Sequence, residues 1–348
     1  MINLQSATLR HVAVHYVGNQ GIDETLFLSS DVIDLRNEFL ADILTNSFTK
    51  PFADKNEFHR FVHSSDVQLN EVFNFTGQFF ANQDLFLELS KNISKHLYTK
   101  TTHPKVKGGE IYLAYFENCI LEDELCDAIG IFKTENKEIF LKAEESGDNY
   151  MLDPELGINI NKLDKGAFIF NTSQSDGRRV VILDNLSKGF EAQYWKDDFL
   201  GLTPCADAYH YTKQYMNMTK DFVTKAMPAE HQTDRAAQID MLNRSLAYFK
   251  EKPTFSIQKF EEEVIQNDEI RDSFQSYRAQ YQSDKNVALN DEFDISDAAV
   301  KKQAKVYKSV LKLDKNFHVY IHGDKDKIEK GIDADGRKFY KLYYEQEN

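Results

Sequence analysis

Cysteine and long apolar runs are both scarce in this chain of 348 residues. The cysteines are odd in number, and we expect no disulfide framework from Cys119, Cys126 and Cys205. No stretch approaches the roughly 20 consecutive apolar residues that span a bilayer. The start of the sequence also lacks a basic region followed by an apolar core. We therefore expect a cytoplasmic protein with no membrane partner.

Glycine-rich phosphate loops and compact metal-binding motifs are absent as well. Neither G-x-x-x-x-G-K-[S/T] nor G-x-G-x-x-G occurs, which removes the usual sequence support for nucleotide hydrolysis and for a Rossmann cofactor site. Cys119 and Cys126 lack the close spacing of a zinc motif. His11 and His15, about 13 Å apart on a predicted strand, are interpreted as surface histidines. We expect no cofactor and no metal.

Apolar and aromatic residues are plentiful enough for a packed core, at 41% and 13% of the chain. Short alternating runs such as Ile111 to Phe116 predict strands, and the stretches between them show helical spacing. From Glu110 to about Asn185 the pattern predicts a mostly antiparallel sheet, and after Pro204 helical spacing dominates. The sequence therefore predicts an α+β fold.

The predicted boundary lies near residue 204. Residues 1–203 are predicted to form a mixed α+β domain that contains the antiparallel sheet. Residues 204–348 are predicted to form a mainly helical domain with a basic helix from Ser296 to Leu311. A C-terminal β-hairpin, made of Phe317 to His322 and Arg337 to Tyr344, is predicted to close it around the turn-forming Asp335-Gly336. The alternative is that the whole chain folds as one compact unit.

Charge is distributed unevenly along this acidic chain. The formal net charge is −14, and residues 110–155 hold thirteen acids against three lysines. By contrast, residues 91–107 carry five lysines and no acid, and residues 301–315 carry six lysines and one acid. Because phosphate binding requires local Lys and Arg, and not a basic average, these two segments are candidate DNA contacts. We call them the lysine islands.

The second lysine island falls on the predicted basic helix. At 100° per residue four of its six lysines lie within about 60° of one another, beside an apolar stripe that would pack against the protein. The alternative is that these lysines simply form the solvent-exposed face of an amphipathic helix. The nominated DNA-contacting residues are Lys91, Lys95, Lys105 and Lys107 in the first island, and Lys301, Lys305, Lys308 and Lys312 in the second.

A metal-dependent nuclease is the enzymatic alternative. Asp127 followed by Glu135 and Lys137 is an acid with a downstream Glu-x-Lys, a set that could hold a magnesium ion. Glu135 and Lys137 fall in a predicted polar turn between strands, and a plain charged loop is the preferred interpretation. We therefore expect no catalytic residues and no enzymatic activity.

Several separated blocks resemble the 37-kDa nucleoid-associated protein family (NdpA-like), in the expected order over roughly residues 100–345. The resemblance implies a cytosolic bacterial protein associated with the nucleoid, and with DNA or with proteins that manage DNA topology. It implies no known enzymatic activity and supplies no DNA-contacting positions, so the nominated lysines rest on the charge map alone. The blocks are Thr102 to Tyr112, Asp127 to Lys133, Ile160 to Gly166, Tyr194 to Leu200 and Ile295 to Lys315.

The leading hypothesis from the sequence is a nucleoid-associated protein that binds double-stranded DNA non-specifically through its lysine-rich faces. The second is a protein-interaction adaptor for a topoisomerase or another DNA-handling complex. It would use the acidic segment 110–155 against a basic partner. A homodimer would place two basic faces on one duplex, but the sequence leaves the oligomeric state open.

Overall fold

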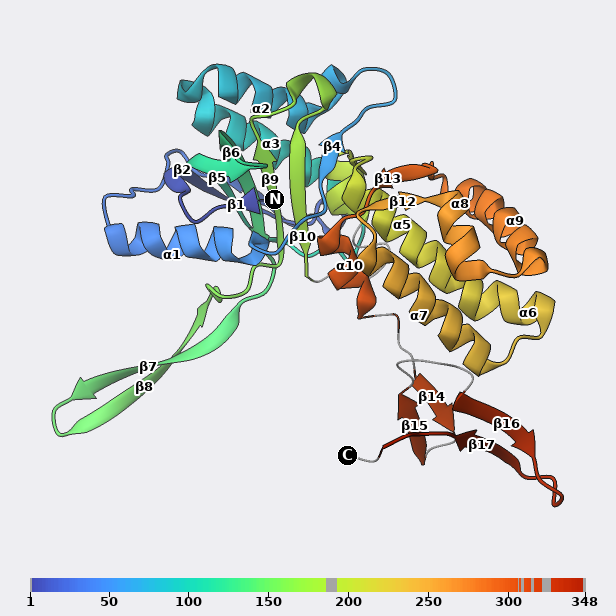
Figure 1. Ribbon diagram of the computed structural model, residues 1–348. Coiled ribbons are helices and arrows are strands. Elements are labelled where there is room, and N and C mark those ends of the chain that lie inside the picture. Colours follow the sequence, from blue (N-terminus) through green and yellow to red (C-terminus); the bar gives the residue numbers. More distant parts are fainter. Residues whose placement is uncertain are drawn as a thin grey trace. The chain divides into compact units, whose positions relative to one another are not determined.

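The computed structural model describes residues 2–185, 193–305, 307, 310–313, 316–320 and 327–346. The chain divides into two compact units, Met1–Cys205 and Ala206–Asn348. Helices and strands occur in both units (Figure 1), so the predicted α+β class is confirmed. Within the described residues, no helix is both long enough and apolar enough to cross a membrane.

A nine-stranded sheet forms the centre of the N-terminal unit (Figure 1). Its described strand pairs all run antiparallel, which confirms the mostly antiparallel sheet predicted from the alternating apolar runs. The strand order is β11 (Leu202–Pro204), β4 (His59–Phe61), β10 (Arg179–Asp184), β9 (Lys165–Phe170), β6 (Glu124–Thr134), β5 (Gly109–Leu121), β2 (Thr8–Val17) and β3 (Leu26–Leu28), with β1 (Ile2–Asn3) beside β5.

Helices cover both faces of this sheet. The helices α2 (Glu71–Ala81) and α3 (Phe86–Lys100) pack on one face, and α1 (Glu38–Thr49) packs on the other. The strand β9 shows why, because all six of its residues are buried. Its Ala167 and Ile169 belong to the core under α2 and α3, whereas Phe168 and Phe170 belong to the core under α1. Successive side chains of a strand point to opposite faces, so β9 is apolar from Gly166 to Phe170.

The segment between β6 and β9 stays apart from the sheet. The strands β7 (Glu138–Ser146) and β8 (Asn149–Gly157) pair with each other and form a two-stranded ribbon that extends away from the sheet (Figure 1). We call residues 138–157 the arm. These residues fall within the segment from Glu110 to about Asn185 that was predicted to form one sheet, and they do form strands, but their placement in the main sheet is wrong. Alternation predicts a strand and does not show which strand it pairs with.

The C-terminal unit is a cluster of helices with three small two-stranded sheets in its described part. Its core is rich in aromatic side chains, such as Tyr215, Phe222, Phe255 and Phe274, which are buried together. The helices are α5 (Ala208–Asp221), α6 (Met227–His231), α7 (Arg235–Glu251), α8 (Ile257–Phe260), α9 (Asp268–Lys285) and α10 (Asp297–Ala304), and the strands are β12 (Thr254–Ser256), β13 (Glu292–Asp294), β14 (Val310–Leu313), β15 (Phe317–Tyr320), β16 (Ile328–Ile332) and β17 (Lys338–Leu342).

The predicted basic helix is shorter than expected. It begins as predicted after Ser296, whose side chain accepts a hydrogen bond from the Ala299 amide, but α10 ends at Ala304. Beyond it, Tyr307 is buried and donates its hydroxyl to the Met216 carbonyl at 2.5 Å. The strand β14 then follows, paired with β15. The apolar positions from Val310 onward suit a strand as well as a helix, so periodicity alone gave the wrong element.

A C-terminal β-hairpin closes the chain, as predicted, but its strands are β16 and β17. The predicted Asp335-Gly336 turn connects them, with the Gly336 amide donating to the Asp333 carbonyl at 3.0 Å. The predicted pairing of Phe317 to His322 with Arg337 to Tyr344 is wrong, because β15 takes the nearer strand β14 as its partner. Short connections between neighbouring strands are the commoner arrangement.

Candidate nucleic-acid interface

The first lysine island lies on α3 and on the loop that joins it to β5. Leu89, Ile93 and Leu97 are buried against the sheet. At helical spacing this leaves Lys91 and Lys95 on the opposite side of the helix. Lys95 is exposed and Lys91 is half-buried, and both Lys105 and Lys107 are exposed on the following loop.

Buried polar groups hold this loop in place. Asn19 is fully buried, and its side-chain amide donates to the carbonyls of His103 and Val106 at 2.9 and 2.6 Å. The Thr101 hydroxyl donates to the Gly18 carbonyl at 2.9 Å. These bonds tie the backbone on both sides of Lys105 to the end of β2. A loop that is already ordered loses less conformational freedom when it binds a ligand.

The four nominated lysines of this island carry unneutralised charge. Within the described part of the chain, none of Lys91, Lys95, Lys105 and Lys107 pairs with a carboxylate. Lys107 donates to the neutral Asn136 side chain at 3.0 Å. Six of the thirteen acids of the segment 110–155 are on the arm, and the two nearest this loop in sequence or space are already paired, Glu110 with Lys137 and Glu135 with Lys133. The ammonium groups are therefore available to an anionic partner.

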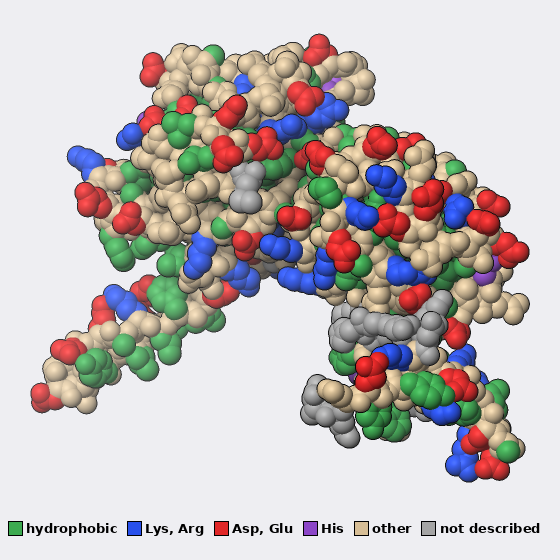
Figure 2. Space-filling view, in the orientation of Figure 1, with side chains coloured by type: hydrophobic (Ala, Val, Ile, Leu, Met, Phe, Trp, Pro, Cys, Tyr) green, Lys and Arg blue, Asp and Glu red, His purple; other side chains and the backbone are tan. Residues whose placement is uncertain are grey.

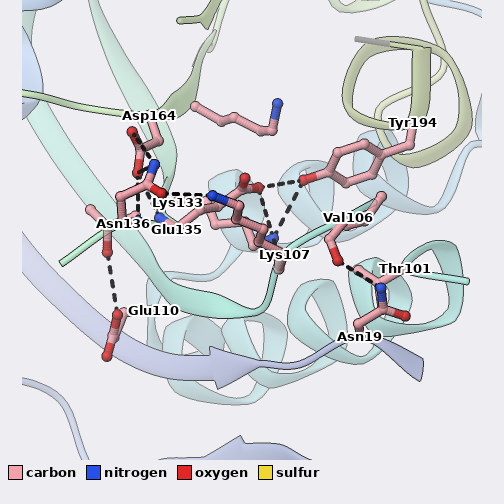
Figure 3. A network of polar contacts seen from close by, with 12 residues as sticks. Asn19, Thr101, Val106, Lys107, Glu110, Lys133, Glu135, Asn136, Asp164 and Tyr194 are labelled. Atoms are coloured by element: carbon pink, nitrogen blue, oxygen red, sulfur yellow. Dashed lines mark hydrogen bonds and ion pairs between the residues drawn. The ribbon is translucent and has the colours of Figure 1, made fainter. Parts of the chain in front are cut away.

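A network of buried charges lies next to the loop (Figure 3). Lys133, which has no exposed surface, donates to the Lys107 carbonyl at 2.5 Å and to Glu135 at 3.0 Å. The Tyr194 hydroxyl donates to the same Glu135 oxygen at 2.9 Å. Burial lowers the pKa of Lys133, and the neighbouring Glu135 charge opposes that shift. The network therefore places the buried Lys133–Glu135 ion pair next to the backbone of Lys107, one of the nominated lysines.

A second buried pair lies beside the first on the neighbouring strand. Lys165 is the cross-strand partner of Lys133, and its ammonium group forms an ion pair with Asp184 at 2.8 Å. Both ammonium groups also face the Tyr194 ring, at 5.7 and 5.2 Å from its centroid. Like charges on directly opposed residues destabilise a sheet. The ion pairs with Glu135 and Asp184 offset the repulsion between Lys133 and Lys165.

Asp164 connects this network to the base of the arm. One of its carboxylate oxygens accepts hydrogen bonds from the Glu135 and Asn136 amides at 2.7 and 3.0 Å. Asn136 in turn accepts from the Lys107 ammonium group. Asp164 is itself buried at 2% exposure. The turn that leads from β6 into the arm is therefore fixed by buried hydrogen bonds, and it holds Lys107 from the other side.

Sequence reasoning missed this network. Lys133 and Lys165 each adjoin an apolar strand run directly, with Phe132 before the first and Gly166-Ala167 after the second. A charge placed inside a buried run is a signal for a paired lysine, since an unpaired buried charge is costly. Tyr194, by contrast, was interpreted as part of a resembling block with no role of its own.

The second lysine island is only partly preserved as a helical face. Lys301 and Lys305 are exposed one turn apart, on α10 and at its C-terminal cap. Lys312 lies on β14 opposite His318, so it does not continue this face, and Lys308 lies outside the described residues. The face of four lysines predicted on one helix is therefore wrong, and two of its members remain together.

The residues nominated for a nuclease do not form a metal site. Asp127 is near the start of β6 and Glu135 follows its end, so eight residues of extended strand separate them by roughly 26 Å. Carboxylate oxygens bind Mg²⁺ at about 2 Å, so these two cannot share an ion. Lys137 pairs with Glu110 at 2.6 Å. No group of three His, Cys, Asp or Glu among the described residues could hold a metal.

The family model described as nucleoid-associated protein YejK matches residues 13–337 of this chain. No curated protein matches it. The match extends over both compact units, from β2 to the turn of the terminal hairpin, and so includes both lysine islands and the arm. The resemblance of the separated sequence blocks is thereby confirmed, and the chain belongs to this family of nucleoid-associated proteins.

Proposed function

We propose that this protein binds double-stranded DNA without reading its sequence, through phosphate contacts made by Lys91, Lys95, Lys105 and Lys107. The observation that carries the proposal is the combination of exposed or half-buried lysines, unpaired with carboxylates in the described structure, and a loop whose backbone is fixed by Asn19. Family membership supports a role at the nucleoid. Phosphate contacts of this kind position a protein on a duplex and carry no sequence information.

The lysines of α10 are a second contact surface in this proposal. Lys301 and Lys305 are exposed, and the Lys302 ammonium group rests over the Tyr209 ring at 5.9 Å. Two contacts add less affinity than four. We therefore expect their removal to weaken DNA binding less than removal of the first island does.

A salt series on a mixed-sequence duplex tests the proposal. The logarithm of the association constant falls with the logarithm of salt concentration by about 0.9 per phosphate contact. Glutamine at the four nominated lysines of the first island should flatten this slope by about 3.6 and lower the affinity at low salt at least tenfold. The measurement is fluorescence anisotropy of a labelled duplex across the salt series.

The matched control carries four other Lys→Gln changes at exposed positions of the C-terminal unit. This control has the same net charge as the test variant. If the position of the lysines determines DNA binding, and not the total charge, the control should keep the wild-type salt dependence. Equal losses in both variants would refute a defined lysine surface. The control positions are Lys225, Lys250, Lys259 and Lys285.

A protein-interaction adaptor is the second candidate, and the arm favours it. The arm carries six acidic residues against one lysine, and it exposes several large apolar side chains. Such a surface repels phosphate and suits a protein. If the wild-type chain fails to bind DNA at low salt, the adaptor function replaces DNA binding, and a partner such as a topoisomerase should be sought by pull-down.

A further inference from the structure

The two faces of the arm differ sharply in composition. In the antiparallel register, Ile139 lies opposite Leu156 and Leu141 lies opposite Pro154, so these side chains share one face. The opposite face pairs Phe140 with Glu155 and Lys142 with Asp153. The first of these faces is almost entirely apolar, and we call it the apolar face. Its members include Ile139, Leu141, Tyr150, Leu152, Pro154 and Leu156.

The apolar face is open to solvent within the chain. Leu141 and Leu152 are 63% and 64% exposed, and Ile139 and Leu156 are exposed still further. Figure 2 shows hydrophobic side chains gathered along the arm, with acidic side chains at its tip. A two-stranded ribbon is at best marginally stable in water unless its hydrophobic face packs on something. Contiguous exposed apolar surface of this kind marks an interaction site.

The charges of the arm determine what can cover this face. The arm has a net charge of −5, from six acids and Lys142, which excludes nucleic acid as the occupant. Most of these acids lie on the face opposite to the apolar one, or in the turn. Glu145 is on the apolar face, near the tip, where the Tyr150 hydroxyl donates to it at 3.0 Å. An apolar partner can therefore approach without burying an unpaired carboxylate.

We propose that the apolar face packs against the apolar face of the arm of a second copy of this chain. Two such ribbons would form a four-stranded, two-layer sandwich, with the charged faces of both ribbons outside. The self-complementary composition favours this occupant, because a two-fold interface brings the same patch from each copy together. The inference does not depend on DNA binding.

The available area is sufficient for a specific interface. The apolar face has five large side chains, each of which presents on the order of 100 Å² of apolar surface. Two copies would together bury about 1,000 Å², at the lower limit for a biological interface. We therefore expect a dimer that dissociates on dilution, and not an obligate one.

Sedimentation equilibrium of the full chain tests this proposal. The wild type should approach twice the chain mass of 40.3 kDa as its concentration rises. Leu141→Glu with Leu152→Glu should raise the dimer dissociation constant at least 100-fold. The matched control is Phe140→Glu with Met151→Glu, which adds the same charge to exposed apolar positions on the opposite face, at 49% and 58% exposure. It should leave the dimer intact.

Three results would overturn the proposal. The first is a wild type that remains monomeric at every concentration tested. In that case, specific capture of a different protein that is lost in the Leu141/Leu152 variant would assign the apolar face to that protein. Equal dissociation by both variants would show that added charge, and not the apolar face, controls the dimer. A dimer that survives both variants forms through another surface. An unchanged thermal transition of the N-terminal unit verifies that the variants fold.

Discussion

Glu135→Ala is expected to lower the free energy of unfolding of the N-terminal unit by about 3–5 kcal/mol, because it leaves the buried Lys133 ammonium group without its carboxylate. Lys133 has no exposed surface, and the Glu135 side chain is 6% exposed. The Tyr194 hydroxyl would lose its acceptor in the same step. Urea unfolding followed through Trp195, which is the only tryptophan and is fully buried in this unit, measures the change.

Two companion variants separate the buried charge from general damage. Lys133→Met combined with Glu135→Leu removes both charges, and it should recover most of the loss, since an apolar pair of similar volume often replaces a buried ion pair at little cost. Glu144→Ala breaks an exposed pair with Lys142 on the arm and should change stability by less than about 0.5 kcal/mol. A double variant as unstable as Glu135→Ala would show that lost packing, and not the unpaired charge, dominates.

The same substitution also bears on the proposed interface. Lys133 donates to the Lys107 carbonyl, and the Glu135 amide donates to Asp164 at the base of the arm. The buried charges thus lie between the loop of the first lysine island and the turn into the arm. The physical role of the network is to hold two surface elements in place. It contributes no group to either surface itself.

Local sequence patterns predicted the elements of the fold better than their partners. The runs that form β2, β5 and β9 are recognisable because side-chain alternation and apolar content are local properties. The C-terminal end of α10 and the pairing of β15 were mispredicted for the opposite reason. A stretch such as Val310 to Leu313 becomes a strand because Phe317 to Tyr320 pairs with it, and no pattern within the stretch itself shows this.

In the candidate site, too, only the features that depend on local sequence could be predicted. The exposed lysines of the first island could be nominated from a charge map, since nothing else in the sequence neutralises them locally. The buried network depends on Tyr194, whose ring faces Lys133 and Lys165 although it lies 61 residues after Lys133 in the chain. His15 was interpreted as a surface residue and is 1% exposed. That interpretation is wrong because the covering residue, Ser90, lies on α3, far along the chain.

His15 is held in its neutral form by two hydrogen bonds of opposite sense. Its Nδ1 accepts from the Ser29 amide at 3.1 Å, so that nitrogen cannot carry a proton, and its Nε2 lies 2.9 Å from the Ser90 hydroxyl. The Ser90 hydroxyl donates to the Leu87 carbonyl, which leaves it to accept from Nε2. Burial, and to a lesser degree the charge of Lys91, lowers the pKa of His15 from 6.5 to about 4.

The N-terminal unit should therefore lose about 2 kcal/mol of stability between pH 7.5 and pH 5 through His15 alone. Between these values the unfolded chain binds the histidine proton and the folded chain does not, so stability falls as the pH is lowered through 6.5 towards 4. Urea unfolding at several pH values, on wild type and His15→Gln, measures the effect. Burial also lowers the pKa of His96, whose contribution cancels in the comparison because both proteins contain it. If His15→Gln has the same pH dependence of stability as the wild type, folding does not lower the pKa of His15, and the prediction is wrong.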